Sequence, residues 1–170
     1  MDFTLTQAYP AGLDRLWAVF GHPEYPHRKY SALGATDFRL QRFHVTAKTI
    51  EVELERDVPV DRSRLPSWVR RMVGGQQRLR HRTRWRRVSP KRVTAELDIA
   101  PVRLPVHARG VGTIVEIAPG MTRMILTWQV KSSVPMLGEK VERLFADQVR
   151  TALDDDHAFT LQYLRQVPAA

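Results

Sequence analysis

The hydrophobic pattern of the chain is organised around one long segment, residues 135–166. At the helical period of about 100° per residue, its apolar side chains collect on one side and its charged side chains on the other. The apolar side consists of Val141, Phe145, Val149, Ala152, Phe159 and Tyr163. The segment therefore predicts an amphipathic C-terminal helix, and a helix of this kind needs a broad apolar surface to lie against.

Strand-like alternation in the rest of the chain predicts such a surface. In residues 122–132 the side chains of Met124, Leu126, Trp128 and Val130 share one face, which predicts a strand with one buried side. The same alternation predicts further strands at 3–9, 36–43, 45–58, 77–88, 93–99 and 107–117. Helical spacing predicts short helices at 12–21 and 26–33 and a short helix or helical loop within 59–75.

This order of elements predicts an α+β domain spanning residues 1–168. We expect an antiparallel sheet of about seven strands, curled around the long C-terminal helix, with two short helices after the first strand. The segment 59–75 interrupts the strands, and its role is open between a lid over the interior and a surface helix.

The formal net charge of +9 suggests nucleic-acid binding until the charges are placed on the strands. Five arginines from Arg78 to Arg86 occupy alternate positions of one strand. The neighbouring strands carry carboxylates on their outward face, namely Glu51, Glu53, Glu55, Asp57, Glu96 and Asp98. Because opposite charges on paired strands stabilise a sheet, we interpret the arginines as a solvated charge ladder and expect no nucleic-acid partner.

Composition narrows the chemistry further. The chain has no Cys, which excludes disulfides and thiolate metal sites, and no histidine pair has the spacing of a metal motif. We expect no metal and no cofactor. Polar residues such as Asp2 and Gln7 break any signal-peptide core, and no apolar run is long enough to span a bilayer. A cytoplasmic protein without stable membrane insertion is therefore expected, and its oligomeric state is undetermined.

Three stretches of the chain carry a family resemblance: AYPAGLDRLWAVFGHPEY near the start, VPMLGEKVERLFADQV before the last helix and HAFTLQYL near the end. Together they resemble the START-like or SRPBCC superfamily, the helix-grip fold of the birch pollen allergen and of polyketide cyclases. More narrowly, the chain resembles an actinobacterial family classed as a domain of unknown function. The resemblance implies an apolar cavity between sheet and helix that binds lipids, sterols or polyketides; a minority of members catalyse cyclisation or dehydration.

We therefore expect the chain to bind a hydrophobic or amphipathic small molecule, as a carrier or sensor. Arg109 shares strand parity with Val111 and Val115, so we expect it to face inward and to hold any anionic head group. The expected ligand-binding residues are Trp85, Arg109, Trp128, Gln148, Ala152, Phe159 and Tyr163. Two alternatives are open: a cyclase- or dehydratase-like enzyme, and a protein-interaction module with a filled core.

The enzyme alternative rests on Asp156 and His81 as acid and base, because both break the apolar pattern of their elements. Asp156 has two interpretations. It meets Arg109 or His81 across a cavity, or the helix bends near 154–156 and the carboxylate reaches water or caps a turn. The residues leave open whether the chain is an enzyme.

Overall fold

The computed structural model describes residues 1–167, apart from the side chain of Arg64. The expected domain boundary at residue 168 lies outside the described residues. The helices are α1 (Leu13–Phe20), α2 (Glu24–Ala32), α3 (Ser67–Met72) and α4 (Gly138–Gln166), with a 3₁₀ turn at Arg62–Arg64. The strands are β1 (Asp2–Tyr9), β2 (Thr36–Val45), β3 (Thr49–Pro59), β4 (Gln76–Ser89), β5 (Arg92–Pro101), β6 (Val106–Ala118) and β7 (Met121–Ser132). Within residues 1–167, no helix has the length and apolarity needed to span a bilayer.

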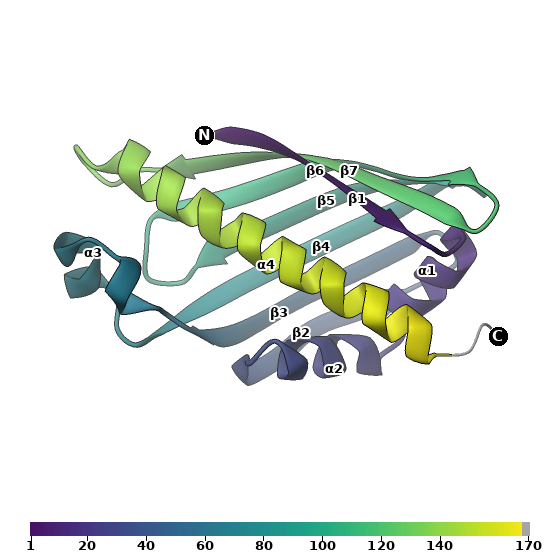
Figure 1. Cartoon of the computed structure of the whole chain (residues 1–170), viewed down its shortest axis with the longest axis horizontal. Helices are drawn as coiled ribbons and strands as arrows, with labels where there is room; N and C mark the ends of the chain where they lie inside the picture. Colours follow the sequence, from purple (N-terminus) through teal and green to yellow (C-terminus); the bar gives the residue numbers. More distant parts are fainter. Residues whose placement is uncertain (168–170) are drawn as a thin grey trace.

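All seven strands form one antiparallel sheet in the order β1-β7-β6-β5-β4-β3-β2. The long helix α4 runs diagonally across one face of this sheet, called the inner face below (Figure 1). The short helix α2 lies beside β2 and the second half of α4, whereas α3 lies at the opposite end of the sheet. The predicted α+β helix-grip architecture is confirmed.

Two helix boundaries differ from the sequence-based prediction, each for a local reason. The helix α4 begins at Gly138 instead of Pro135, because Met136 has a φ of 60°, which is outside the helical region. The helix α2 begins at Glu24 and contains Pro26 in its first turn, where the missing N–H breaks no helical hydrogen bond. Gly34 ends this helical region with a φ of 76°.

The core lies between the inner face and α4. Trp128 of β7 has no exposed surface, and its indole ring crosses the neighbouring Gly110 of β6. A Cβ atom at Gly110 would lie 2.6 Å from that ring, so only glycine leaves room for the tryptophan. The helix α4 packs on β7, β6 and β1 and buries Val141, Phe145, Ala146, Val149, Leu153, Thr160 and Leu164.

The outer face of the sheet carries the predicted charge ladder. Arg78 of β4 contacts Glu55 at 2.9 Å and Asp57 at 3.1 Å, both on β3. Farther along the same pair of strands, Arg82 contacts Glu53 at 3.0 Å. Arg78, Arg80, Arg82 and Arg84 are thus matched in charge across the strands, as the alternation predicted, whereas Arg86 is paired with Thr49 and Thr94.

Candidate functional site

The centre of the inner face retains solvent-accessible surface although it lies under α4. Val52, Thr83 and Leu97 are paired in one row across β3, β4 and β5, and all three are only half-buried. Inner-face residues next to them, such as Leu54 and Ala95, are almost fully buried. The Thr83 hydroxyl has no hydrogen-bond partner among residues 1–167. The side chains above the middle of the sheet are therefore not closely packed.

Two of the four expected aromatic ligand-binding residues, Trp85 and Trp128, lie in the buried core, in separate places. Trp85 meets Phe20 of α1 edge-on, with ring centroids 4.5 Å apart, whereas Trp128 stacks on Phe3 at 6.2 Å. The indole N–H groups of both tryptophans are buried and have no acceptor among residues 1–167. They are donors on the inner face that no protein group satisfies.

The second half of α4 brings two of the expected residues to α2. Phe159 and Tyr163 are half-buried and surround Tyr25, with ring centroids 5.9 Å and 5.3 Å from it. Ala152, one turn before Asp156, is also half-buried. These side chains pack beside the main core and lie outside its fully buried part.

Asp156 meets a partner that the sequence analysis did not consider, Lys29 of α2. The Lys29 Nζ donates a hydrogen bond to Asp156 Oδ2 at 3.0 Å and lies 2.9 Å from Oδ1, where the hydrogen-bond geometry is poor. Burial disfavours the ammonium, but the carboxylate outweighs this effect, and the pKa of Lys29 is raised. Asp156 contacts neither Arg109 nor His81, so the expected pairing across a cavity is not formed. Its side chain is 30% exposed, as in the interpretation in which the carboxylate reaches water.

Burial, together with the neighbouring Arg56, favours the neutral form of His81. The Arg56 Nε donates a hydrogen bond to His81 Nε2 at 3.2 Å, so this nitrogen acts as an acceptor. Burial and the nearby charges of Arg56 and Lys29 lower the pKa of His81 well below its usual value. No group of three His, Asp or Glu side chains within residues 1–167 could hold a metal ion.

Arg56 is the polar residue that the sequence analysis missed. It lies on the inner face of β3 and is only 6% exposed. Its guanidinium carbon lies 4.5 Å from the centroid of the Tyr30 ring, on α2. The signal was present in the sequence, because Arg56 continues the inward parity of Ile50 and Leu54.

Two tyrosines close the polar region toward α4. The hydroxyl groups of Tyr25 and Thr160 are 2.6 Å apart, and the Tyr9 hydroxyl donates to Gln7 at 3.2 Å. Burial is the main cause that raises the pKa of both tyrosines, so both hydroxyl groups are neutral at physiological pH. Together with Lys29, Arg56, His81 and Asp156 they form a buried polar cluster, which we call the inner cluster.

The prediction that Arg109 faces the interior is wrong. Arg109 lies on the outer face of β6, and its guanidinium is 3.6 Å from Glu96 of the paired strand β5. Val111, which suggested the inward parity, is itself 43% exposed. The inner positions of this strand include Val106, Ala108, Gly110 and Ile114, and the glycine in the middle of this series weakened the apolar signal on which parity depends.

A small apolar pocket lies beneath α3. Its volume is about 40 Å³, and Gln77 and Gln148 are the polar residues among those that line it. The α3 side chains Val69 and Trp68 face α4 residues there, including Phe145. Gln148 is thus the one expected ligand-binding residue found at this end of α4, one helical turn before Ala152. The segment 59–75 thus covers an apolar recess on one side.

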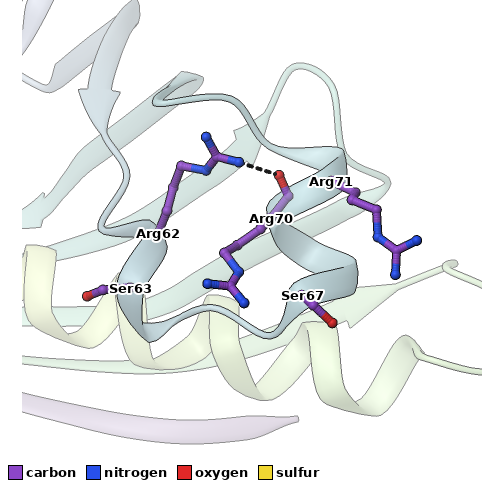
Figure 2. A pocket seen from close by; sticks show the side chains of 5 residues that line it. All are labelled: Arg62, Ser63, Ser67, Arg70 and Arg71. Carbon is purple, nitrogen blue, oxygen red and sulfur yellow. Dashed lines mark hydrogen bonds between the residues drawn. The ribbon is translucent and has the colours of Figure 1, made fainter.

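The other face of the same segment forms a wide, open concavity of about 730 Å³. Its walls are Arg62, Ser63, Ser67, Arg70 and Arg71, all exposed (Figure 2). Arg62 donates a hydrogen bond to the backbone oxygen of Arg70 at 3.1 Å, as Figure 2 shows. Since no apolar side chain lines this concavity, it does not suit an apolar ligand, although it is the larger of the two.

The sequence of residues 4–164 matches the family described as "Protein of unknown function (DUF2505)". The chain belongs to this DUF2505 family. No curated protein matches the sequence significantly.

Solved structures relate this DUF2505 fold to other proteins. The Zhui aromatase/cyclase from a Streptomyces species is 13% identical with a TM-score of 0.58, over 99% of this chain and 96% of that one. Ara h 8.0201 is 8% identical with a TM-score of 0.59, over 95% and 98% of the two chains. The Thermus thermophilus protein TTHA0849 is 14% identical with a TM-score of 0.56, over 96% and 99%. The fold is therefore SRPBCC-like, and at these identities the likeness concerns the fold alone.

Proposed function

We propose that this chain binds a hydrophobic or amphipathic small molecule between the inner face of the sheet and α4. The observation that carries the proposal is the accessible surface left on Val52, Thr83 and Leu97 in the middle of the sheet. In a domain with a filled core, these inward-facing positions would be as buried as their neighbours. Apolar walls with a few convergent polar groups are what small-molecule sites generally show.

Unsatisfied donors on the same face support the proposal. The indole N–H groups of Trp85 and Trp128 have no protein acceptor, and the Thr83 hydroxyl has no partner among residues 1–167. A buried donor without a partner is costly, and a ligand with polar atoms would satisfy it. A protein that only stabilised its own fold would gain from apolar residues at these positions.

The lid role of α3 is part of the proposal. The pocket beneath α3 holds about 40 Å³. This is close to the space of one liquid water, about 30 Å³, so a ligand must displace α3 to pass this way. The side chains that hold α3 form a small cluster of their own, with Leu65, Val69 and Val73 as its buried members. A segment held by so few apolar contacts opens at a lower free energy than the main core.

The enzyme alternative receives no specific support from the arrangement of its two residues. Asp156 is paired with Lys29 and His81 with Arg56, so the proposed acid and base do not act on one another. The interaction-module alternative requires a filled interior, which the row of accessible side chains argues against. The cytoplasmic location and the absence of a nucleic-acid partner stay predictions.

Native mass spectrometry of the chain purified from its own host tests the proposal. We expect a bound small molecule that denaturation releases and that can then be identified. A variant that fills the interior, Leu97→Trp, is expected to lose this molecule, because the larger side chain occupies the proposed space. The matched control is Val111→Trp on the outer face, where the residue is 43% exposed. Equal retention by both variants would exclude the proposed site.

A further inference from the structure

We propose that Arg56 is the binding site for a carboxylate, and that the ligand of this chain is an apolar molecule with one carboxylate group. The inference rests on the proposed function, because it assigns the polar end of the ligand whose apolar part lies over the middle of the sheet. It differs from the sequence-based expectation, which gave this role to Arg109.

Arg56 has strong hydrogen-bonding capacity that the protein does not use. Its guanidinium has one hydrogen bond, from Nε to His81, and one stacking contact, with the Tyr30 ring. Among residues 1–167 no other hydrogen bond or ion pair involves this side chain, so its two terminal nitrogens have no protein acceptor. The residue is nevertheless only 6% exposed. A guanidinium that is both buried and unpaired carries a large desolvation cost, which an anion would offset.

The charges of the inner cluster indicate how many negative charges are missing. Lys29 and Arg56 supply two positive charges, and both lie over the same Tyr30 ring, at 4.7 Å and 4.5 Å. Asp156 supplies one negative charge, which the Lys29 ammonium neutralises. His81 is neutral, since its Nε2 accepts a hydrogen bond from Arg56. The cluster therefore carries one net positive charge. Arg56 is the cation that no carboxylate of residues 1–167 contacts, although the charge of Asp156 also acts on it.

The size of this imbalance selects the class of anion. A carboxylate carries one negative charge and offers two oxygens that match the two parallel N–H groups of a guanidinium. A phosphate monoester carries about 1.5 to 2 negative charges at pH 7, so it would leave the cluster negative. The neutral His81 and the protonated Tyr25 and Tyr9 add no further positive charge. The cluster is therefore matched to a monoanion.

The position of Arg56 relative to the accessible row supports a single ligand. His81, which Arg56 contacts, is paired with Leu54 and lies one inner-face step from Thr83 on β4. Successive inner-face residues are about 6.7 Å apart along a strand. His81 is itself only half-buried, so the accessible surface continues from Thr83 toward Arg56. An apolar body above Val52, Thr83 and Leu97 would thus place a terminal carboxylate beside the guanidinium.

Isothermal titration calorimetry with a matched pair of probes tests the inference. Dodecanoate and dodecan-1-ol have the same apolar chain and differ in the charge of the end group. We expect the wild-type chain to bind dodecanoate at least about tenfold more tightly than the alcohol, because a charge-assisted bidentate pair is among the stronger polar contacts. In Arg56→Gln this preference should disappear while binding of the alcohol stays unchanged.

Two further variants keep the experiment decisive. Arg82→Gln on the outer face removes a cation that is 59% exposed and should leave the preference intact. Arg56→Lys keeps the positive charge but loses the two parallel N–H groups of the guanidinium, so it should retain a reduced preference for dodecanoate over the alcohol. Equal binding of acid and alcohol by the wild type, or an undiminished preference in Arg56→Gln, would overturn the inference and leave the proposed function standing. Binding of neither probe by the wild type would overturn the proposed function.

Discussion

The arginines on the two faces of the sheet differ in whether they contact a carboxylate. On the outer face, Arg78, Arg82 and Arg84 of β4 each lie within 3.5 Å of a carboxylate on β3. On the inner face, Arg56 of β3 has no carboxylate partner among residues 1–167 and is only 6% exposed. These outer arginines each contact a carboxylate, whereas the inner one is buried and contacts none.

This difference separates charges that serve the fold from a charge that does not. An exposed cross-strand pair adds a small stabilisation and keeps the sheet in register. A buried guanidinium without an anion opposes folding, since its desolvation is not repaid within the chain. A residue that disfavours the empty protein is better explained by what it binds than by what it stabilises.

The largest expected effect comes from breaking the one matched pair of the inner cluster. Asp156→Asn leaves the Lys29 ammonium beside α4 without its carboxylate. We expect this change to lower the free energy of unfolding by about 2 to 4 kcal/mol, as for other pairs that are mostly buried. Urea unfolding followed by circular dichroism measures it. Lys29→Met added to Asp156→Asn should recover part of the loss. If the free energy of unfolding fell by less than about 0.5 kcal/mol, the Lys29–Asp156 pair would contribute no more than an exposed ion pair of the outer face, and the prediction would be wrong.

The second effect is a dependence of stability on pH that arises from His81. Its pKa is lowered in the folded chain, so below the usual value of 6.5 the unfolded chain binds a proton that the folded chain does not. Stability should therefore fall as the pH decreases below 6.5, by up to about 1.4 kcal/mol per pH unit. His81→Gln should flatten this slope. The exposed His44→Gln serves as the control, and an equal slope in wild type and His81→Gln would refute the assignment.

A third comparison applies one substitution to both faces. Arg56→Met removes the unmatched charge together with its contacts to Tyr30 and His81, and we expect it to raise the free energy of unfolding of the ligand-free chain by about 1 kcal/mol. Arg82→Met on the outer face should change it by less than about 0.5 kcal/mol. Thermal and urea unfolding provide both values. Marked destabilisation by Arg56→Met would mean that the guanidinium serves the fold after all.

The smallest effect concerns the charge ladder. Glu55 accepts hydrogen bonds from Arg78 and Arg80, and the first of these is the main cause that lowers the pKa of Glu55. Glu55→Gln should lower the free energy of unfolding by about 0.5 to 1 kcal/mol at low salt. The difference should shrink at 1 M salt, where exposed charges are screened within about 3 Å. A loss that salt does not change would indicate a packing effect instead.

The architecture was predictable because it depends on periodicity. The strands repeat every two residues and α4 every 3.6, and both periods are visible in a single sequence. The same count placed the outer arginines opposite Glu51, Glu53 and Asp57, since consecutive strands pair in an antiparallel meander. Helix ends were less predictable, because the unusual backbone of Met136 leaves no mark in the apolar pattern.

Strand alternation predicted the wrong orientation where the inner face of a strand lacks apolar side chains. In β6, Gly110 occupies an inner position so that Trp128 can cross it, while Val111 is exposed on the outer side. Counting apolar residues therefore turned Arg109 inward by mistake. In β3 the alternation was correct, and it places Arg56 after Leu54 on the buried face. Arg56 was missed because a charged residue is not expected at a buried position.

The sequence by itself determined the sheet, the helix that crosses it and the charge ladder, because these follow from local periods and from pairing between neighbouring strands. Only the tertiary structure decided which charges meet inside. Lys29 and Asp156 are 127 residues apart, and Tyr30 of α2 lies over Arg56 of β3. Contacts between elements that are distant along the chain depend on how α2 and α4 pack on the sheet. The periodicity of hydrophobic residues contains no information about that packing.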